Sequence, residues 1–319
     1  MNGVLQVESY AEFLAKEYLA DFVSRGGAAV KFCVGDDVAR AALRRALTAA
    51  ASADGYAYAS VDAASTRVHM VDQVFFAVAR SLDFEELAAR ITTTAYRAAG
   101  FPTTAAIGLG VEAVAAHHGV DPGELHRSVR RRLEQDLLAD ATLARELRLA
   151  IFRLAQHDLA TGDMDDAEQA AVLDWLTGDL RRISALRSSL IFTRVTRANA
   201  HHLLVGLPRL LTRTGHSGLV LDLDISRLAV ERRPPAELQE GPYYTKAAVL
   251  DAYEVLRQLV DATDELASTL VIVSAGPEFV VDEVRGLVAY TALQLRLADE
   301  VRDRNRVNPF AALVRLEAR

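Results

Sequence analysis

A single cysteine, Cys33, is present among the 319 residues of the chain. One thiol excludes a disulfide framework within the chain, and it leaves no Cys-x-x-Cys pair for a zinc or redox centre. The sequence also lacks any run that approaches the roughly 18 uninterrupted apolar residues of a membrane-spanning helix. It shows no basic flank followed by an apolar run, which is the pattern of a secretory signal. We therefore expect a cytoplasmic protein that does not enter a membrane.

Motifs of hydrolases and metal centres are scarce as well. There is no Gly-x-Ser-x-Gly nucleophile elbow. Each of the two histidine pairs, His117-His118 and His201-His202, consists of sequence neighbours, whose side chains point apart on a helix, so we expect no shared metal ion. A net charge of −7 argues against a protein that coats nucleic acid over its whole surface, and leaves room only for local basic faces.

Apolar, β-branched segments alternate with long helical patterns along the chain, of which 51% is hydrophobic. Five segments read as buried strands: residues 28–34, 56–61, 218–224, 269–274 and 312–316. Strands that alternate with helices favour an α/β fold, here a three-layer sandwich with a parallel sheet. The composition therefore predicts a large core built around that sheet.

One helical stretch is too long for a plain crossover between two strands. Residues 103–157 are almost all helix formers, and we predict that residues 103–198 form an all-helical insertion subdomain. The N-terminal helix and the first half of the core then occupy residues 1–102. The second half of the core occupies residues 199–319.

The stretch Ala28–Leu47 has the frame of a phosphate-binding P-loop. It reads as a buried strand, a turn opened by Gly35, and a helix whose inner face we expect to carry Val38, Ala42 and Leu43. In a P-loop this frame delivers backbone N–H groups to a phosphate at the N-terminus of the helix.

The residues that bind nucleotide in a P-loop are missing from this strand-turn-helix unit. Counted from Gly35, the positions of the second glycine, the lysine and the Ser/Thr hold Arg40, Ala41 and Ala42. Alanine supplies neither the charge that reaches the terminal phosphates nor the oxygen that ligates Mg²⁺, and arginine adds bulk where the backbone should approach phosphate. The carboxylates of Asp36-Asp37 add about 1 kcal/mol or more of repulsion each. The sequence therefore predicts a P-loop fold that has lost normal nucleotide hydrolysis.

A second feature of such folds, an acidic strand end, is partly present here. Asp224 lies where an acid of a P-loop ATPase holds Mg²⁺ through water, but the following position, usually a glutamate that polarises the attacking water, is Ile225. Asp222 shares a strand face with Asp224 and is either a second polar group at the strand end or a buried acid that needs a partner. Asp62, just past another strand, is either a ligand or, as we favour, a helix N-cap.

Two arginine clusters are candidate contacts for a nucleic-acid backbone. The first is the face formed by Arg127, Arg130, Arg131 and Arg132, and the second is the run Arg302, Arg304 and Arg306. For the first cluster we favour a solvated face that pairs with neighbouring acids such as Glu134 and Asp136.

Several segments resemble the BREX-system ATP-binding-domain family, which comprises P-loop ATPases of bacterial phage-defence clusters. The matching segments are Lys31–Gly35, Trp175–Asp179, Gly218–Asp224, Tyr243–Arg257, Ala275–Phe279, Arg285–Leu293 and Asn308-Pro309 leading into Leu313–Leu316. These segments follow the order of the family, and the resemblance, from Lys31 to Leu316, spans most of the chain.

The resemblance implies a fold related to the AAA+ and helicase-loader ATPases, and an oligomer that works on or near DNA. It also implies that Arg285 serves as a sensor or as an interface arginine that acts on a neighbouring subunit. Ala41, Ala42 and Ile225 depart from the family pattern at the positions that bind and cleave ATP. We therefore expect a degenerate member without ordinary ATPase activity.

Three functions are compatible with this reading. The first is an inactive, structural or regulatory subunit in a complex with an active ATPase paralogue or a helicase. The second is a switch that still binds ATP or ADP weakly with Mg²⁺, through Gly35, the helix N-terminus and Asp224, with Arg40 as counter-charge. The third is an adaptor that contacts DNA through the arginine clusters.

Overall fold

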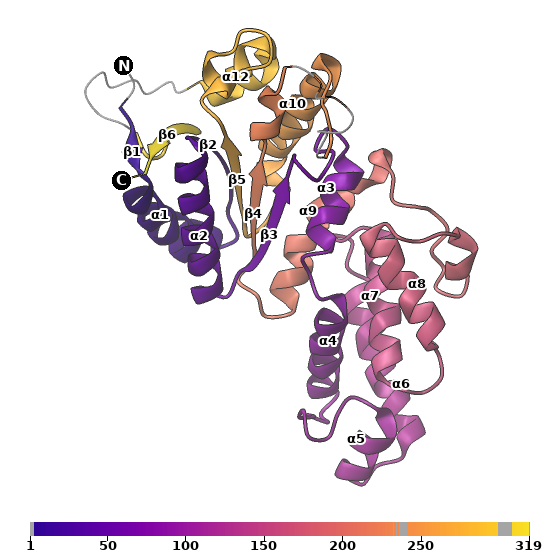
Figure 1. Ribbon diagram of the computed structural model, residues 1–319. Coiled ribbons are helices and arrows are strands. Elements are labelled where there is room, and N and C mark those ends of the chain that lie inside the picture. Colours follow the sequence, from indigo (N-terminus) through magenta and orange to yellow (C-terminus); the bar gives the residue numbers. More distant parts are fainter. Residues whose placement is uncertain (1–2, 232, 234, 236–240, 299–307, 319) are drawn as a thin grey trace. The chain divides into compact units, whose positions relative to one another are not determined.

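The computed structural model describes residues 3–231, 233, 235, 241–298 and 308–318, and the chain divides into two compact units (Figure 1). The first unit combines Met1–Ser81 with His216–Arg319, and the second comprises Leu82–Gly215. The first unit contains all the strands of the sheet, whereas the second is helical. Arg302, Arg304 and Arg306 lie outside the described residues.

The first unit is built on a parallel sheet of six strands in the order β1-β6-β2-β5-β4-β3. The strands are β1 (Leu5–Gln6), β2 (Ala28–Val34), β3 (Ala57–Asp62), β4 (Leu219–Asp224), β5 (Thr269–Ala275) and β6 (Leu313–Glu317). The predicted α/β class and the parallel sheet are confirmed, and the architecture is consistent with a P-loop-like core. Strand β1 was not predicted, because two residues are too few to show a period.

Parallel pairing in register gathers the carboxyl ends of four strands at one edge of the sheet. Asp62 of β3 pairs with Asp224 of β4, which pairs with Ser274 of β5, and Val34 of β2 pairs with Ala275 of β5. Ligands of open α/β sheets bind at this edge. The residues of the predicted nucleotide site therefore lie around one place.

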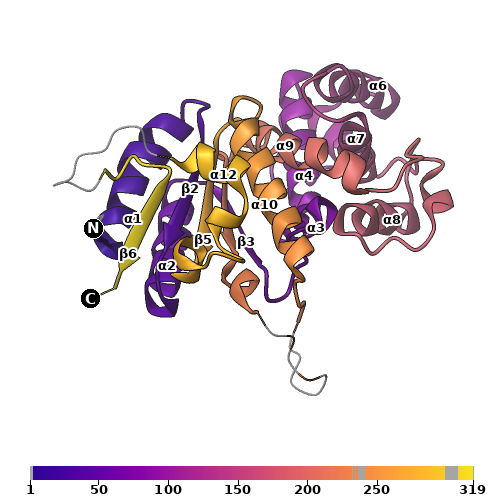
Figure 2. The same ribbon diagram turned by 90° about the horizontal axis from the view of Figure 1, so that it is seen from above.

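Helices cover both faces of the sheet, as Figure 2 shows from above. One face is covered by α1 (Val7–Phe13), its π-helical continuation (Leu14–Val23) and α2 (Asp37–Ala53). The other helices in the described part of this unit are α3 (Val71–Ala79), α10 (Lys246–Asp261), α11 (Glu278–Val281) and α12 (Thr291–Leu297). Short 3₁₀ turns occur at Ser226–Ala229, Ala262–Asp264 and Leu287–Ala289. Leu43 of α2 is buried in the core on the first of these faces, together with Cys33 of β2.

The predicted inner face of α2 is partly wrong. Leu43 is buried, but Val38 is 63% exposed. Helix α2 begins at Asp37, so Val38 belongs to its first turn, which borders an open cleft at the sheet edge instead of packing on the strands.

The second unit consists of packed helices around a core of its own. Its helices are α4 (Phe84–Ala98), α5 (Val111–His118), α6 (Pro122–Leu133) with a π-helical end at Glu134–Leu138, α7 (Arg145–Asp158), α8 (Asp166–Thr177) and α9 (Arg197–Arg213), with a 3₁₀ turn at Ile183–Leu186. Residues 103–198 all belong to this unit. No helix among the described residues is both long and apolar enough to cross a membrane.

Candidate nucleotide site

The connection from β2 to α2 consists of two residues, Gly35 and Asp36. A Cβ atom at Gly35 would lie 2.9 Å from the Cβ of Ala39 and 3.2 Å from the carbonyl oxygen of Leu316, so only glycine fits there. Asp36 is the N-cap of α2, and its Oδ1 accepts the backbone N–H of Ala39 at 2.8 Å. A carboxylate of the chain itself therefore occupies a helix N-terminal donor of the kind that binds phosphate in a P-loop.

Arg40 is fixed by three interactions along the same edge. Its Nη1 donates to the carbonyl oxygen of Gly35 at 3.0 Å, its Nη2 to Asp37 at 2.7 Å, and its Nε to Asp224 Oδ2 at 3.4 Å. The guanidinium donors on all three nitrogens thus have partners within the protein. The predicted counter-charge for a nucleotide is engaged with the carboxylate predicted to hold Mg²⁺.

Arg44, one helical turn further along α2, completes the network. Its Nε donates to Asp222 Oδ2 at 2.7 Å, and its Nη2 donates to Asp224 Oδ2 at 3.2 Å. The second oxygen of Asp224 accepts the backbone N–H of Ser226 at 2.9 Å. Both oxygens of the candidate Mg²⁺ acid are therefore already bonded.

Asp222 is fully buried, with 0% of its surface exposed. Besides Arg44, it accepts hydrogen bonds from Tyr58 at 3.2 Å and from Ser274 at 3.2 Å. Burial raises the pKa of the Asp222 carboxyl, and the Arg44 guanidinium opposes that rise. Burial and the neighbouring Asp222 carboxylate raise the pKa of Tyr58 to about 12. Of the two interpretations of Asp222, the structure shows the buried acid with partners.

An open cleft of about 780 Å³ lies over this network, within the first unit. Its described lining carries more carboxylates than cations. The carboxylates are Asp36, Asp37, Asp62, Asp224 and Glu278, and the cations are Arg40 and Arg227. Among the described residues, no group of three or more His, Cys, Asp or Glu side chains is arranged to hold a metal ion. The cleft is thus an acidic surface.

ATP with Mg²⁺ does not fit the residues of this cleft. Ala41 and Ala42 supply no ligand, Asp36 occupies the first helical turn, and Asp224 is held by Arg40 and Arg44. A triphosphate would also meet an excess of carboxylates, which repel it. The described lining of the cleft therefore offers neither the cationic cradle nor the open acid that phosphoryl transfer uses.

Asp62 caps no helix, so that interpretation is wrong. It is the last residue of β3, its Oδ1 accepts the backbone N–H of Ala64 at 2.7 Å, and its side chain borders the cleft. The turn that follows β3 is stabilised by this bond between a side chain and its own local backbone.

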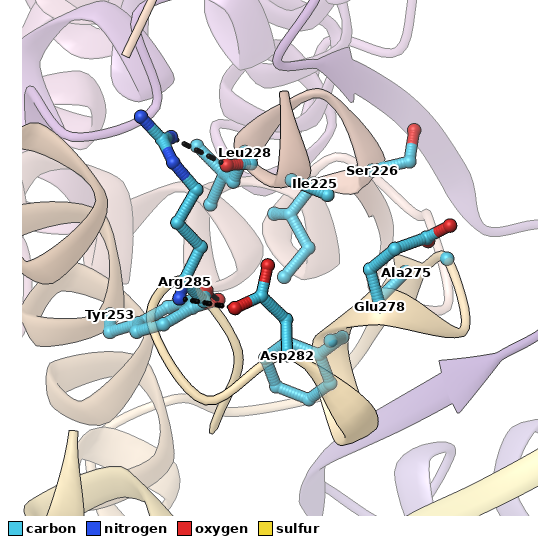
Figure 3. Close-up of a pocket in the computed structure, with 11 residues that line it drawn as sticks. Ile225, Ser226, Leu228, Tyr253, Ala275, Glu278, Asp282 and Arg285 are labelled. Atoms are coloured by element: carbon cyan, nitrogen blue, oxygen red, sulfur yellow. Dashed lines mark hydrogen bonds between the residues drawn. The ribbon is translucent and has the colours of Figure 1, made fainter. Parts of the chain in front are cut away.

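Ile225, at the position predicted for a catalytic glutamate, is buried beside a small apolar pocket drawn in Figure 3. The pocket has a volume of about 10 Å³, which is at most enough for one water molecule. Leu228, Tyr253 and Phe279 also line it. The side chain at this position therefore contributes to packing.

Arg285 lies on the same pocket and is only 7% exposed. Figure 3 shows its guanidinium pointing toward Leu228, whose carbonyl oxygen accepts from Nη1 at 3.0 Å. Its Nη2 donates to the carbonyl oxygen of Tyr244 at 3.0 Å and to the hydroxyl of Tyr243 at 3.3 Å. Its role as an interface arginine stays a prediction, and that role would require these bonds to break.

Sequence reasoning did not identify Arg44, Tyr58 and Ser274 as parts of the network. A signal was present, because Arg40 and Arg44 are four residues apart on a helix, and Asp222 and Asp224 are two apart on a strand. Two cations on one helical face opposite two acids on one strand face predict an ion-pair cluster once helix and strand are known to pack.

Comparison with known families adds one finding. The model of the family described as BREX system ATP-binding protein BrxC/D matches residues 11–318. The resemblance inferred from the sequence is thereby confirmed. No curated protein and no solved structure matches the chain significantly.

Proposed function

The chain belongs to the BREX system ATP-binding protein BrxC/D family, and we propose that it is a catalytically inactive member. In this proposal it is an AAA-like, P-loop-type subunit that serves a multi-protein, DNA-associated complex of phage defence as a structural or regulatory component. The observation that supports the proposal most is that Arg40 and Arg44 both bind the carboxylate of Asp224.

The size of the expected catalytic defect follows from what is missing. Removing a single electrostatic element from an enzyme site costs about 10²–10³ in rate. Here the lysine position is Ala41, the hydroxyl position is Ala42 and the glutamate position is Ile225. Three such losses together leave no ordinary route to phosphoryl transfer.

Exposed apolar side chains support the part of the proposal in which the chain binds other proteins. Four large apolar side chains between residues 281 and 295 are more than half exposed: Val281, Val284, Val288 and Leu295. They belong to the segment that runs from α11 to α12 in the first unit. Large apolar side chains that stay exposed so close together in the sequence support an oligomer with an active ATPase paralogue or a helicase as partner.

A reconstitution experiment tests this proposal. The chain is co-purified with a family member that retains the P-loop lysine, and the ATPase rate of that partner is measured with and without the chain. We expect a stable complex and a changed rate, and we expect both to weaken when Val284 and Val288 are replaced by serine. A partner rate that is identical in both cases, without co-elution, contradicts the proposal.

The alternative of an ATP/ADP switch has less support. It would use Arg40 and the first-turn N–H groups of α2, but Arg40 and the N–H of Ala39 already have partners. Nucleotide would have to displace Asp36 and Asp224 before it could bind.

A further inference from the structure

In the second unit, the last part of the connection from α8 to α9, together with α9 itself, differs in charge from the rest of the chain (Figure 1). Residues 180–215 contain seven arginines and neither aspartate nor glutamate, although the whole chain has a net charge of −7. Four of these arginines are exposed, and their side chains make no hydrogen bond or ion pair within the described part of the chain: Arg181, Arg182, Arg187 and Arg197.

Two large apolar side chains are exposed among these arginines. Leu190 is 52% exposed and Phe192 is 59% exposed. Leu190 also has a positive φ of 59°, a backbone conformation that costs a residue with a Cβ atom about 1 kcal/mol or more. Leu190 thus combines a strained backbone conformation with an apolar side chain that is about half exposed to solvent.

Hydrogen bonds to neighbouring residues stabilise this strained segment. The Trp175 indole N–H donates to the carbonyl oxygen of Thr193 at 2.9 Å, and the Ser189 hydroxyl donates to Glu168 at 2.6 Å. Arg194 donates to the backbone of Leu180 at 2.9 Å. The segment is therefore a preorganised surface, which lowers the entropy lost on binding.

We propose that this surface, defined as residues 181–197, binds single-stranded nucleic acid. Exposed guanidinium groups pair with phosphates in bidentate fashion, and an exposed phenyl ring is a stacking platform for a base. The inference does not rest on the inactivity of the nucleotide site. It also concerns a different surface from the α6 arginines, of which Arg130 is paired with Glu134.

An acidic protein partner fits the same surface less well. Two apolar side chains supply far less than the roughly 1,000 Å² that a specific protein interface buries. A single strand needs only phosphate neutralisation and one or more stacked bases. The four exposed arginines and the exposed ring of Phe192 match those two requirements.

Fluorescence anisotropy with a labelled oligothymidylate of about 20 nucleotides tests the inference. If four phosphates are neutralised, affinity falls about 50-fold between roughly 50 and 200 mM salt. The double variant Arg187→Gln/Arg197→Gln should reduce this salt-dependent fall to about sevenfold. Phe192→Ala should lower affinity at least about fivefold while leaving the salt dependence unchanged.

A matched control removes the same charge elsewhere in the second unit. The variant Arg127→Gln/Arg131→Gln on α6 also replaces two exposed arginines and should leave binding within about twofold. Thermal melts establish that each variant folds. Equal losses of affinity in both double variants would overturn the inference, and so would a folded wild-type chain that does not bind the oligonucleotide. Displacement of the oligonucleotide by polyglutamate, combined with no effect of Phe192→Ala, would also overturn it and would indicate an acidic protein partner.

Discussion

Arg44 on helix α2 and Asp222 on strand β4 form an ion pair with a 2.7 Å separation between Nε and Oδ2, beneath the carboxyl edge of the sheet. Asp222 is wholly buried, so the pair fixes the helix to the strand at the place where a P-loop ATPase would bind its metal and phosphates. The same Arg44 side chain also donates to Asp224, the carboxylate predicted to hold Mg²⁺.

Replacing Arg44 by alanine should destabilise the first unit by about 2 kcal/mol. The variant leaves a buried carboxylate without its cation, a loss that costs about 3–5 kcal/mol in fully buried pairs and less here, because the Arg44 side chain is 35% exposed. Urea denaturation followed by far-UV circular dichroism measures the effect. The control is Arg45→Ala, which changes the neighbouring exposed arginine of the same helix and should cost less than about 0.5 kcal/mol. Equal costs for both variants would contradict a structural ion pair.

Replacing Gly218 by alanine should be among the most damaging single changes, at about 3 kcal/mol or more. Gly218 has a φ of 147°, and a Cβ there would lie 2.0 Å from the carbonyl oxygen of Ser268, at the start of β4. Gly162 also has a positive φ, but a Cβ atom added there would meet no other atom within 4 Å, so Gly162→Ala should cost only about 1 kcal/mol. Yields of folded protein and melting temperatures check the difference, and a benign Gly218→Ala would contradict this close approach of the two backbones.

The second unit should become more stable as the pH falls through 6. Burial raises the pKa of Asp158 to about 6, helped by Glu85 and opposed by His157 and by the hydrogen bond from Thr92 at 3.1 Å. Between pH 4 and 6 the folded state then binds a proton that the unfolded state has released, so this carboxyl contributes up to about 3 kcal/mol at low pH that is lost as the pH rises through 6. The fluorescence of Trp175, the only tryptophan, reports this unit during denaturation.

The variant Asp158→Asn supplies the control for this titration. It keeps an acceptor for the Thr92 hydroxyl but carries no charge, so the rise in stability between pH 8 and 5 should largely disappear. A pH profile that is the same in the variant and in the wild-type chain would assign the effect to another group.

Much of the fold could be predicted from the sequence because its signals are local. Strands β2 to β6 lie in mainly apolar segments, and a glycine directly follows or precedes β2, β4 and β5. The strand-turn-helix unit at Gly35 follows from its pattern. Strand β1 has only two residues, and the exposure of Val38 depends on where the first turn of α2 lies relative to the sheet edge. Neither feature has a period that a sequence can display.

The sequence could show which ligands the site lacks, but it could not show which interactions take their place. Ala41, Ala42 and Ile225 reveal lost ligands directly, because the expected residue types are absent. What replaces those ligands depends on contacts about 180 residues apart, such as that between Arg44 and Asp222, and no sequence spacing encodes them. The structure was needed to show that Asp224 is bound by the chain itself.

Isothermal titration calorimetry of the purified chain with Mg·ATP tests the central claim most directly. We predict no binding heat at nucleotide concentrations of about 1 mM, because Arg40, Arg44 and Asp224 are bonded to one another and Asp36 caps the helix. A family member with an intact P-loop, titrated in the same buffer, establishes that the assay detects binding. A saturable heat from the wild-type chain, with a dissociation constant well below the millimolar range, would contradict the account.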